Sequence, residues 1–284
     1  MILIIAEKPS LGRNIAAAIG NMSRRDGYLE GHGYIISWAF GHLFSLADVE
    51  AYSSPQGENG RWSMDNLPCF PKEFKYELRK DSSKNVDGGV AKQFNILEAL
   101  CNRDDVDTIV NAGDADREGE IIVRLCVNKA LKTPKSIKRL WLPDQTPETV
   151  RAALADMKDD SEYDNLANEG FARTYIDWLY GVNLTRYATL KSGTLLRVGR
   201  VIVPIVQAIY DRDMAIKNFV PEKYYSISSA EETNGCKVEL NSKLRFSANE
   251  YQKALSASAE YNACGAYVSS VKSKKEHLIE SAFI

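Results

Sequence analysis

Four acidic residues stand where apolar segments end: Glu7, Asp114, Asp116 and Glu118. Glu7 follows the apolar run 1–6, and the other three follow the β-branched segment 106–110. Alternate residues of an extended segment point the same way, so Asp114 and Asp116 are able to offer oxygens to one cation. Mg²⁺ prefers hard oxygen ligands and keeps several waters, and a divalent cation would relieve the repulsion among these carboxylates. We therefore expect these four carboxylates to form a magnesium site.

The alternative for Asp-Ala-Asp-Arg-Glu is a solvated charged turn, which is the usual meaning of an isolated D-x-D. The buried strand before it and the apolar helix after it make the metal site more specific. Lys8 precedes a helix opened by Pro9-Ser10, where free backbone N–H groups are able to hold a phosphate. It is either a phosphate-neutralising or proton-donating group or simply an exposed lysine. His42 is equally open between a phosphate contact and a turn histidine.

Two strand–helix units are expected to position these groups. The run 1–6 reads as a buried strand, and 11–19 has helical spacing that ends at Gly20. Residues 33–40 and 106–110 read as further strands. Helices are expected over 91–101 and after Glu118, and 53–71 reads as a surface excursion. Alternating strands and helices favour an α/β domain with a parallel sheet covered on both faces.

Beyond this domain the pattern changes twice. Thr146-Pro147 is a good helix start, and from there to about Asn218 we expect helices only. After Pro221 we expect strands at 224–228 and 237–240 around Asn234-Gly235. A helix at 250–261 and a strand at 267–271 follow.

Composition narrows the classes of function. The 284 residues carry a net charge of −2, but the segment 172–200 has a single acidic residue, Asp177, and forms a basic patch. Its basic residues are Arg173, Arg186, Lys191, Arg197 and Arg200. No apolar run reaches the roughly 20 residues of a membrane span, and the N-terminus has no signal-peptide pattern, so we expect a cytoplasmic protein with no membrane contact. The five cysteines have no metal-ligand spacing, so structural zinc and a disulfide framework are not expected.

Read together, these residues resemble the Toprim domain and, more narrowly, the N-terminal half of a type IA DNA topoisomerase of the bacterial topoisomerase III kind. The motifs that carry the resemblance are I-I-A-E-K-P-S-L-G-R at 4–13, W-A-F-G-H-L at 38–43, D-A-D-R-E-G-E at 114–120, G-V-N-L-T-R at 181–186, V-G-R at 198–200 and D-R-D at 211–213. They cover nearly the whole chain, to about Lys275.

The resemblance implies a Rossmann-like Toprim domain at 1–150, the first part of a helical DNA-binding domain at 151–218, and the start of a β-rich arch at 219–284. It also implies an Mg²⁺-dependent enzyme that cleaves one DNA strand through a tyrosine, passes another strand and reseals. Glu7 and Lys8 would be catalytic, in proton transfer and leaving-group stabilisation. The implied metal ligands are Glu7, Asp114, Asp116 and Glu118. Single-stranded DNA would contact Arg173, Arg186, Arg197 and Arg200 through its phosphates.

Two departures from the family pattern bear on activity. After V-G-R the family has a polar Gln-Thr pair, whereas this chain has Ile202-Val203. None of the 14 tyrosines lies in the R-T-D-like context of the family's nucleophile. We therefore expect a fragment cut at a domain junction that binds single-stranded DNA and Mg²⁺ but does not relax supercoils by itself. The alternatives are a Toprim nuclease or primase-like enzyme, or a non-catalytic single-stranded DNA-binding module. For the four arginines, the alternative to phosphate contact is a helix surface that serves solubility.

Overall fold

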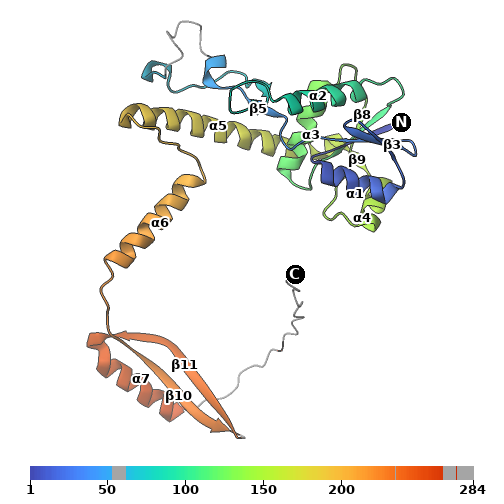
Figure 1. The fold of residues 1–284 in the computed structure, drawn as a ribbon. Coiled ribbons are helices and arrows are strands. Elements are labelled where there is room, and N and C mark those ends of the chain that lie inside the picture. Colours follow the sequence, from blue (N-terminus) through green and yellow to red (C-terminus); the bar gives the residue numbers. More distant parts are fainter. Residues whose placement is uncertain (53–61, 234, 265–272, 274–284) are drawn as a thin grey trace. The chain divides into compact units, whose positions relative to one another are not determined.

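The computed structural model describes residues 1–52, 62–233, 235–264 and 273. It divides into two compact units, Met1–Gln207 and Ala208–Ile284 (Figure 1). No described helix has both the length and the hydropathy that a bilayer span requires.

A seven-stranded sheet forms the centre of the first unit, with the order β2-β3-β4-β1-β7-β8-β9. The four middle strands are parallel, and the pairings β2–β3, β3–β4 and β8–β9 are antiparallel. The middle strands are β4 (Tyr34–Trp38), β1 (Ile2–Ala6), β7 (Thr108–Ala112) and β8 (Ser136–Arg139). The outer strands are β2 (Ser23–Arg25), β3 (Tyr28–Gly31) and β9 (Lys158–Asp159).

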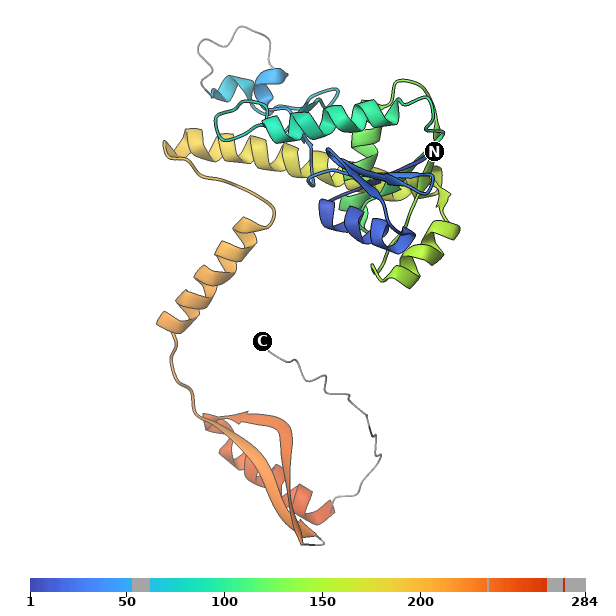
Figure 2. The ribbon, with the colours of Figure 1, turned by 45° about the vertical axis from the view of Figure 1, so that its right-hand side comes forward.

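Helices cover both faces of this sheet (Figure 2). Helices α1 (Pro9–Ile19) and α4 (Pro147–Ala155) pack on one face, where they meet Ile4 and Ala6. Helices α2 (Gly88–Cys101) and α3 (Arg117–Ala130) pack on the other, against Leu3 and Ile5. Successive residues of a strand point to opposite faces, which is why the unbroken apolar sequence of β1 supplies both cores.

The helices that follow β1 and β7 therefore lie on opposite faces of the sheet. Adjacent parallel strands whose following helices diverge in this way leave a crevice at their carboxyl ends, where ligands of open α/β sheets bind. Glu7 follows β1 directly, and Asp114 lies two residues after β7.

The long helix α5 (Asp164–Ser192) packs against α3 through a glycine contact. A Cβ at Gly170 would lie 2.6 Å from Ile121 Cγ2, so the absence of a side chain lets the two helices approach closely. Further along, α6 (Ile202–Lys217) begins in the first unit, continues into the second, and has no buried residue. A two-stranded sheet of β5 (Phe44–Leu46) and β6 (Tyr76–Leu78) and short 3-10 helices at Val49–Ala51, Met64–Asn66 and Asp160–Tyr163 complete the unit.

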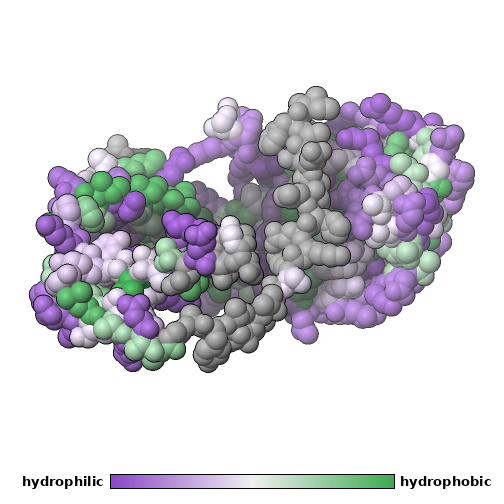
Figure 3. Space-filling model, turned by 90° about the horizontal axis from the view of Figure 1, so that it is seen from below, coloured by the Kyte–Doolittle hydropathy of each residue, from purple (hydrophilic) through white to green (hydrophobic). Residues whose placement is uncertain are grey.

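The second unit contains an antiparallel pair, β10 (Tyr224–Thr233) and β11 (Cys236–Ser247). A 3-10 turn at Ala248–Glu250 leads into α7 (Tyr251–Cys264), which contacts both strands. Figure 3 shows hydrophobic patches on the surface of the molecule. In the second unit, the side chains of Leu240, Leu244 and Leu255 are exposed.

The predicted fold class is confirmed: a mixed α/β domain with parallel central strands is followed by a helical region. Thr146 caps α4 as expected, with its side chain accepting a hydrogen bond from the Thr149 N–H. The prediction of helices only over 146–218 is wrong in one detail, because Lys158–Asp159 adds an antiparallel edge strand beside β8. Part of the predicted excursion at 53–71 and the predicted strand at 267–271 lie outside the described residues, and the three-part domain division stays a prediction.

Candidate metal and nucleic-acid site

Three segments far apart in sequence meet beyond the carboxyl ends of β4, β1 and β7. The Gly41 N–H donates to the Glu7 carbonyl at 3.0 Å, and the Ala39 N–H donates to the Ala6 carbonyl at 2.8 Å. From the other side, the Asp114 N–H donates to Glu7 Oε2 at 3.2 Å. Glu7 is therefore held between the loop after β4 and the loop after β7.

Glu7, Lys8 and Asp114 form the centre of this arrangement. Lys8 Nζ lies 2.5 Å from Asp114 Oδ2, and both side chains remain partly exposed. Burial raises the pKa of Glu7, and the carboxylates of Asp114 and Asp116 raise it further against the opposing effects of the Asp114 N–H and Lys8. The pKa of Lys8 is also raised, chiefly by its hydrogen bond to Asp114. The structure thus brings together a carboxyl group that resists ionisation and a lysine that stays charged.

Asp116 and Glu118 have other partners. Asp116 is exposed and caps α3, with Oδ1 accepting a hydrogen bond from the Gly119 N–H at 2.8 Å. Glu118 Oε2 lies 3.6 Å from His42 Nε2, and both side chains are about half exposed, at 47% and 48%. Glu118 is therefore turned towards the loop after β4, which carries His42.

The donor chemistry fits Mg²⁺. Within the described part of the chain, no group of three or more Asp, Glu, His or Cys side chains is already arranged around one point. Mg²⁺ is usually bound by only one or two carboxylates, with waters and substrate phosphates completing its shell. Asp114 and Asp116 are near enough to Glu7 to raise its pKa, and a cation would relieve this repulsion.

The loop between β7 and α3 depends on two glycines. A Cβ on Gly113 would lie 1.9 Å from the Gly119 carbonyl oxygen, and a Cβ on Gly119 would lie 2.4 Å from the Asp114 nitrogen. Real side chains essentially never approach backbone atoms so closely. The absence of a side chain at both glycines thus lets the loop fold back on the start of α3.

Sequence reasoning missed two buried residues beneath this loop. Arg139, the last residue of β8, and Glu120, in the first turn of α3, have fully buried side chains that pair at 2.6 Å. The Arg139 guanidinium also donates to the carbonyls of Gly113 and Asp114 at 2.9 and 2.8 Å. The only available signal was the final glutamate of D-R-E-G-E, because Lys138-Arg139 reads as an ordinary basic pair.

The predicted phosphate-binding arginines differ in their surroundings. Arg200 is bound to Asp177 by two hydrogen bonds, of 2.7 and 3.0 Å, and Arg173 lies 3.8 Å from the same carboxylate. The Arg200 pair lowers the pKa of Asp177. Arg197 is exposed and lines a cavity of about 560 Å³ together with Trp178.

Arg186 is the exception among these arginines, because only 6% of its side chain is exposed. Its guanidinium pairs with Asp48 at 2.9 Å and with Glu50 at 2.8 Å, and it lies over the Trp62 ring. A phosphate contact at Arg186 would require these pairs to break. In this structure the residue ties α5 to Asp48, Glu50 and Trp62.

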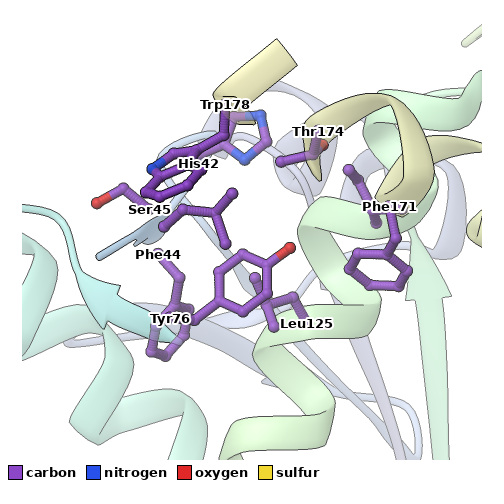
Figure 4. A pocket seen from close by; sticks show the side chains of 10 residues that line it. His42, Phe44, Ser45, Tyr76, Leu125, Phe171, Thr174 and Trp178 are labelled. Carbon is purple, nitrogen blue, oxygen red and sulfur yellow. The ribbon is translucent and has the colours of Figure 1, made fainter. Parts of the chain in front are cut away.

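An apolar pocket of about 360 Å³ lies beside His42, between β5, β6, α3 and α5 (Figure 4). Phe44, Phe171 and Trp178 line it, and the Tyr76 hydroxyl points into the space near Thr174. Burial raises the pKa of Tyr76. His42 lines this pocket and also contacts Glu118 in the first turn of α3. The pocket therefore adjoins the carboxylate site.

Two known families match parts of this chain. The Toprim domain family matches residues 2–143, and the family described as DNA topoisomerase matches residues 161–283. The chain belongs to the type IA DNA topoisomerase family. The resemblance inferred from the motifs is therefore confirmed, including its similarity to topoisomerase III.

Relatives in the family include proteins named DNA topoisomerase 3. The protein from Shouchella clausii is 39% identical over 225 residues, which are 79% of this chain and 29% of the relative. The protein from Bacillus anthracis is 38% identical over 236 residues, or 83% of this chain and 31% of the relative. The protein from Bacillus subtilis is 38% identical over 228 residues, or 80% and 30%. This chain thus spans about a third of the length of the relatives it matches.

Proposed function

We propose that this chain carries the metal-binding and strand-holding part of a type IA topoisomerase centre, which cleaves and reseals single-stranded DNA in the full enzyme. The observation that carries the proposal is the meeting of Glu7, Lys8 and Asp114 at the carboxyl ends of β1 and β7. This crevice is where ligands of open α/β sheets bind. Membership in the topoisomerase family supports the choice of DNA as the ligand.

In this proposal Asp114 and Asp116 are the principal ligands of Mg²⁺, and Glu7 and Glu118 complete the acidic set. When bound, the cation would supply charge neutralisation at the scissile phosphate. Lys8 then leaves Asp114 and faces the phosphate, and Glu118 leaves His42. The Lys8–Asp114 ion pair and the His42–Glu118 contact are both partly exposed, and such contacts contribute little stability.

Glu7 and Lys8 are proposed to handle protons. Burial raises the pKa of Glu7, which favours the protonated form that a proton donor needs. Lys8 keeps its charge and is suited to stabilise the leaving oxygen. The attacking tyrosine is proposed to come from outside these 284 residues, since no tyrosine here has the family context.

Single-stranded DNA is proposed to follow the basic face formed by Arg173, Arg197 and Arg200. Arg197 and Arg200 are exposed, and Trp178 offers an aromatic ring beside Arg197. Phosphate contacts and base stacking on aromatic rings are the usual means of holding a single strand. Arg186 could contact a DNA phosphate only after its ion pairs with Asp48 and Glu50 break.

A cytoplasmic location also stays a prediction.

Metal binding is tested by calorimetric titration of MgCl₂ into the wild type, Asp114→Asn and the double variant Asp114→Asn/Asp116→Asn. We expect each variant to raise the Kd for Mg²⁺ at least about tenfold, because a charged ligand is lost. Asp156→Asn is the control, since that side chain is 76% exposed and pairs only with Lys158 among the described ion pairs. Equal affinity in the wild type and the double variant would overturn the metal assignment.

The chemistry is tested by incubating the chain with labelled single-stranded DNA and Mg²⁺. We expect binding without a covalent DNA adduct. A tyrosine-linked adduct would contradict the proposed external tyrosine. Products with free 5′ phosphates would favour the nuclease alternative, and binding that is indifferent to Asp114 and Asp116 would favour a non-catalytic module.

A further inference from the structure

Arg139 makes an unusually complete set of contacts for a buried arginine. Its side chain is 0% exposed, and all three guanidinium nitrogens are engaged. The bonds are Nε to Glu120 Oε2 at 2.6 Å, Nη1 to the carbonyls of Asn111, Gly113 and Leu140 at 3.2, 2.9 and 2.8 Å, and Nη2 to the Asp114 carbonyl at 2.8 Å. A buried charge is tolerated only when it is paired and hydrogen-bonded in this way.

Two of these acceptors, the carbonyls of Gly113 and Asp114, belong to the loop between β7 and α3 that carries the proposed metal ligands. The parallel pairing of β7 with β8 ends at Asn111 and Arg139, so Gly113 and Asp114 lie beyond the sheet ladder. Their carbonyls are bound instead by the Arg139 guanidinium. The planar guanidinium fork replaces the missing strand partners, which is a geometry that a lysine does not reproduce.

Glu120 and Asn111 fix the opposite side of the guanidinium and the loop. Glu120 Oε1 accepts hydrogen bonds from Asn111 Nδ2 at 3.1 Å and from Arg124 Nε at 2.9 Å. Asn111 Oδ1 in turn accepts from the Gly113 N–H at 3.1 Å. The backbone of Gly113 is therefore bound on both its N–H and its carbonyl by side chains of one buried network.

Asp114 is held at three points by neighbouring residues. Its carbonyl is bound by Arg139, its N–H by Glu7, and its side chain by Lys8. A rotation of the 113–114 peptide would move this carboxylate away from Glu7. Arg139 opposes that rotation because the Gly113 carbonyl would turn away from Nη1, and the buried guanidinium would lose one of its acceptors.

We propose that Arg139 is a positioning residue for the metal site: by binding the Gly113 and Asp114 carbonyls, it sets where the Asp114 carboxylate points. This inference rests on the proposed metal site, and it assigns a role to a residue that does not itself touch metal or DNA. Outer partners that orient metal ligands typically change metal affinity by about 10–100-fold when they are removed.

The test separates positioning from simple stabilisation through two variants. Arg139→Met leaves Glu120 as a buried carboxylate that has lost one of its two arginine partners, and we expect a clear fall in melting temperature. Arg139→Met/Glu120→Gln removes both members of the pair, and we expect it to regain part of that loss. If Arg139 positions the loop, the double variant still lacks the bonds to Gly113 and Asp114, so its loop remains loose.

Two measurements are made on each variant. Hydrogen–deuterium exchange without metal follows the backbone amides of 113–119, and calorimetry with MgCl₂ follows metal affinity. We expect exchange in 113–119 to accelerate about tenfold or more, and the Kd for Mg²⁺ to rise about 10–100-fold, in both variants. Arg139→Lys should fall between these variants and the wild type, because one ammonium is unable to bind all the carbonyls.

Arg103→Met is the matched control. Arg103 is also paired with two carboxylates, Glu30 at 3.0 Å and Asp105 at 2.7 Å, but it lies beside Met1 at the opposite ends of the strands. We expect it to leave exchange in 113–119 and metal affinity within about twofold of the wild type.

The outcomes are distinct. If the double variant is less stable but exchanges and binds Mg²⁺ like the wild type, Arg139 only stabilises the fold and the inference is overturned. If the wild type binds no Mg²⁺, the proposed metal function fails. The exchange of 113–119 then still decides whether Arg139 holds the loop.

Discussion

At the scale of single residues, the raised pKa of Glu7 has a consequence for stability. Burial and the neighbouring carboxylates raise this pKa above its ordinary value of 4.5 in the folded protein. Between the ordinary and the raised value, the folded state binds more protons than the unfolded state. Stability attributable to Glu7 is therefore lost as pH rises through that interval.

We predict that Glu7→Gln raises the melting temperature of the metal-free protein at about pH 7.5 and changes it little at about pH 4. Glutamine keeps an oxygen that accepts from the Asp114 N–H, so the hydrogen bond is preserved. Thermal denaturation in the presence of a chelator measures the effect. Glu148→Gln is the control, because that side chain is 78% exposed. An equal shift at both pH values would contradict the prediction.

Residue type and spacing located Glu7 and Asp114 but not the residues that hold them. A carboxylate after an apolar strand stands out in sequence, and the parallel sheet then brings two such positions together. Arg139 did not stand out, since its role depends on contacts with residues 19 to 28 positions away. Arg186 was expected to contact phosphate because neither Asp48 nor Glu50, more than 130 residues away, is visible as its partner in the sequence.

At the scale of secondary-structure elements, Asp177 on α5 would compete with DNA phosphates for the arginines of the basic face. Its carboxylate holds Arg200 and lies near Arg173, two of the residues proposed to contact DNA phosphates. We predict that Asp177→Asn tightens binding of a labelled oligothymidine about 3- to 10-fold and steepens its salt dependence by about one ion. Fluorescence anisotropy at several salt concentrations measures both quantities.

The control for this experiment is Asp164→Asn on the same helix. Asp164 is also paired with an arginine, Arg124, but that arginine is only 14% exposed and would not become available to DNA. Its oligothymidine affinity should stay near that of the wild type. Weaker or unchanged binding by Asp177→Asn would show that Asp177 does not restrain Arg200.

The long elements were predictable and the short ones were not. Helices α1, α2 and α3 and strands β1, β4 and β7 follow from apolar periodicity and from turn residues. Strands β2, β8 and β9 were missed because they have two to four residues and polar sequences such as Ser-Arg-Arg, which show no alternation. They join the sheet only because each pairs with a longer neighbouring strand.

At the scale of the whole molecule, the two compact units predict separate responses to metal. All four proposed ligands lie in 1–207, so Mg²⁺ at about 100 times its Kd should stabilise that unit by about 2.7 kcal/mol. Differential scanning calorimetry should show one transition that moves upward with Mg²⁺ and one, from 208–284, that does not move. A common shift of all transitions would contradict this assignment, and Asp114→Asn should abolish the shift.

The edge strands of the seven-stranded sheet affect the tendency of the folded chain to aggregate. Its outermost strands, β2 and β9, have only three and two residues, and they include Arg24, Arg25, Lys158 and Asp159. Short, charged edge strands offer a poor template for pairing with another sheet. The pair β10–β11 is different, with strands of 10 and 12 residues. Self-association of the chain through strand pairing is therefore expected to begin at β10–β11. The sheet that carries the acidic site is protected from such pairing by its short, charged edge strands.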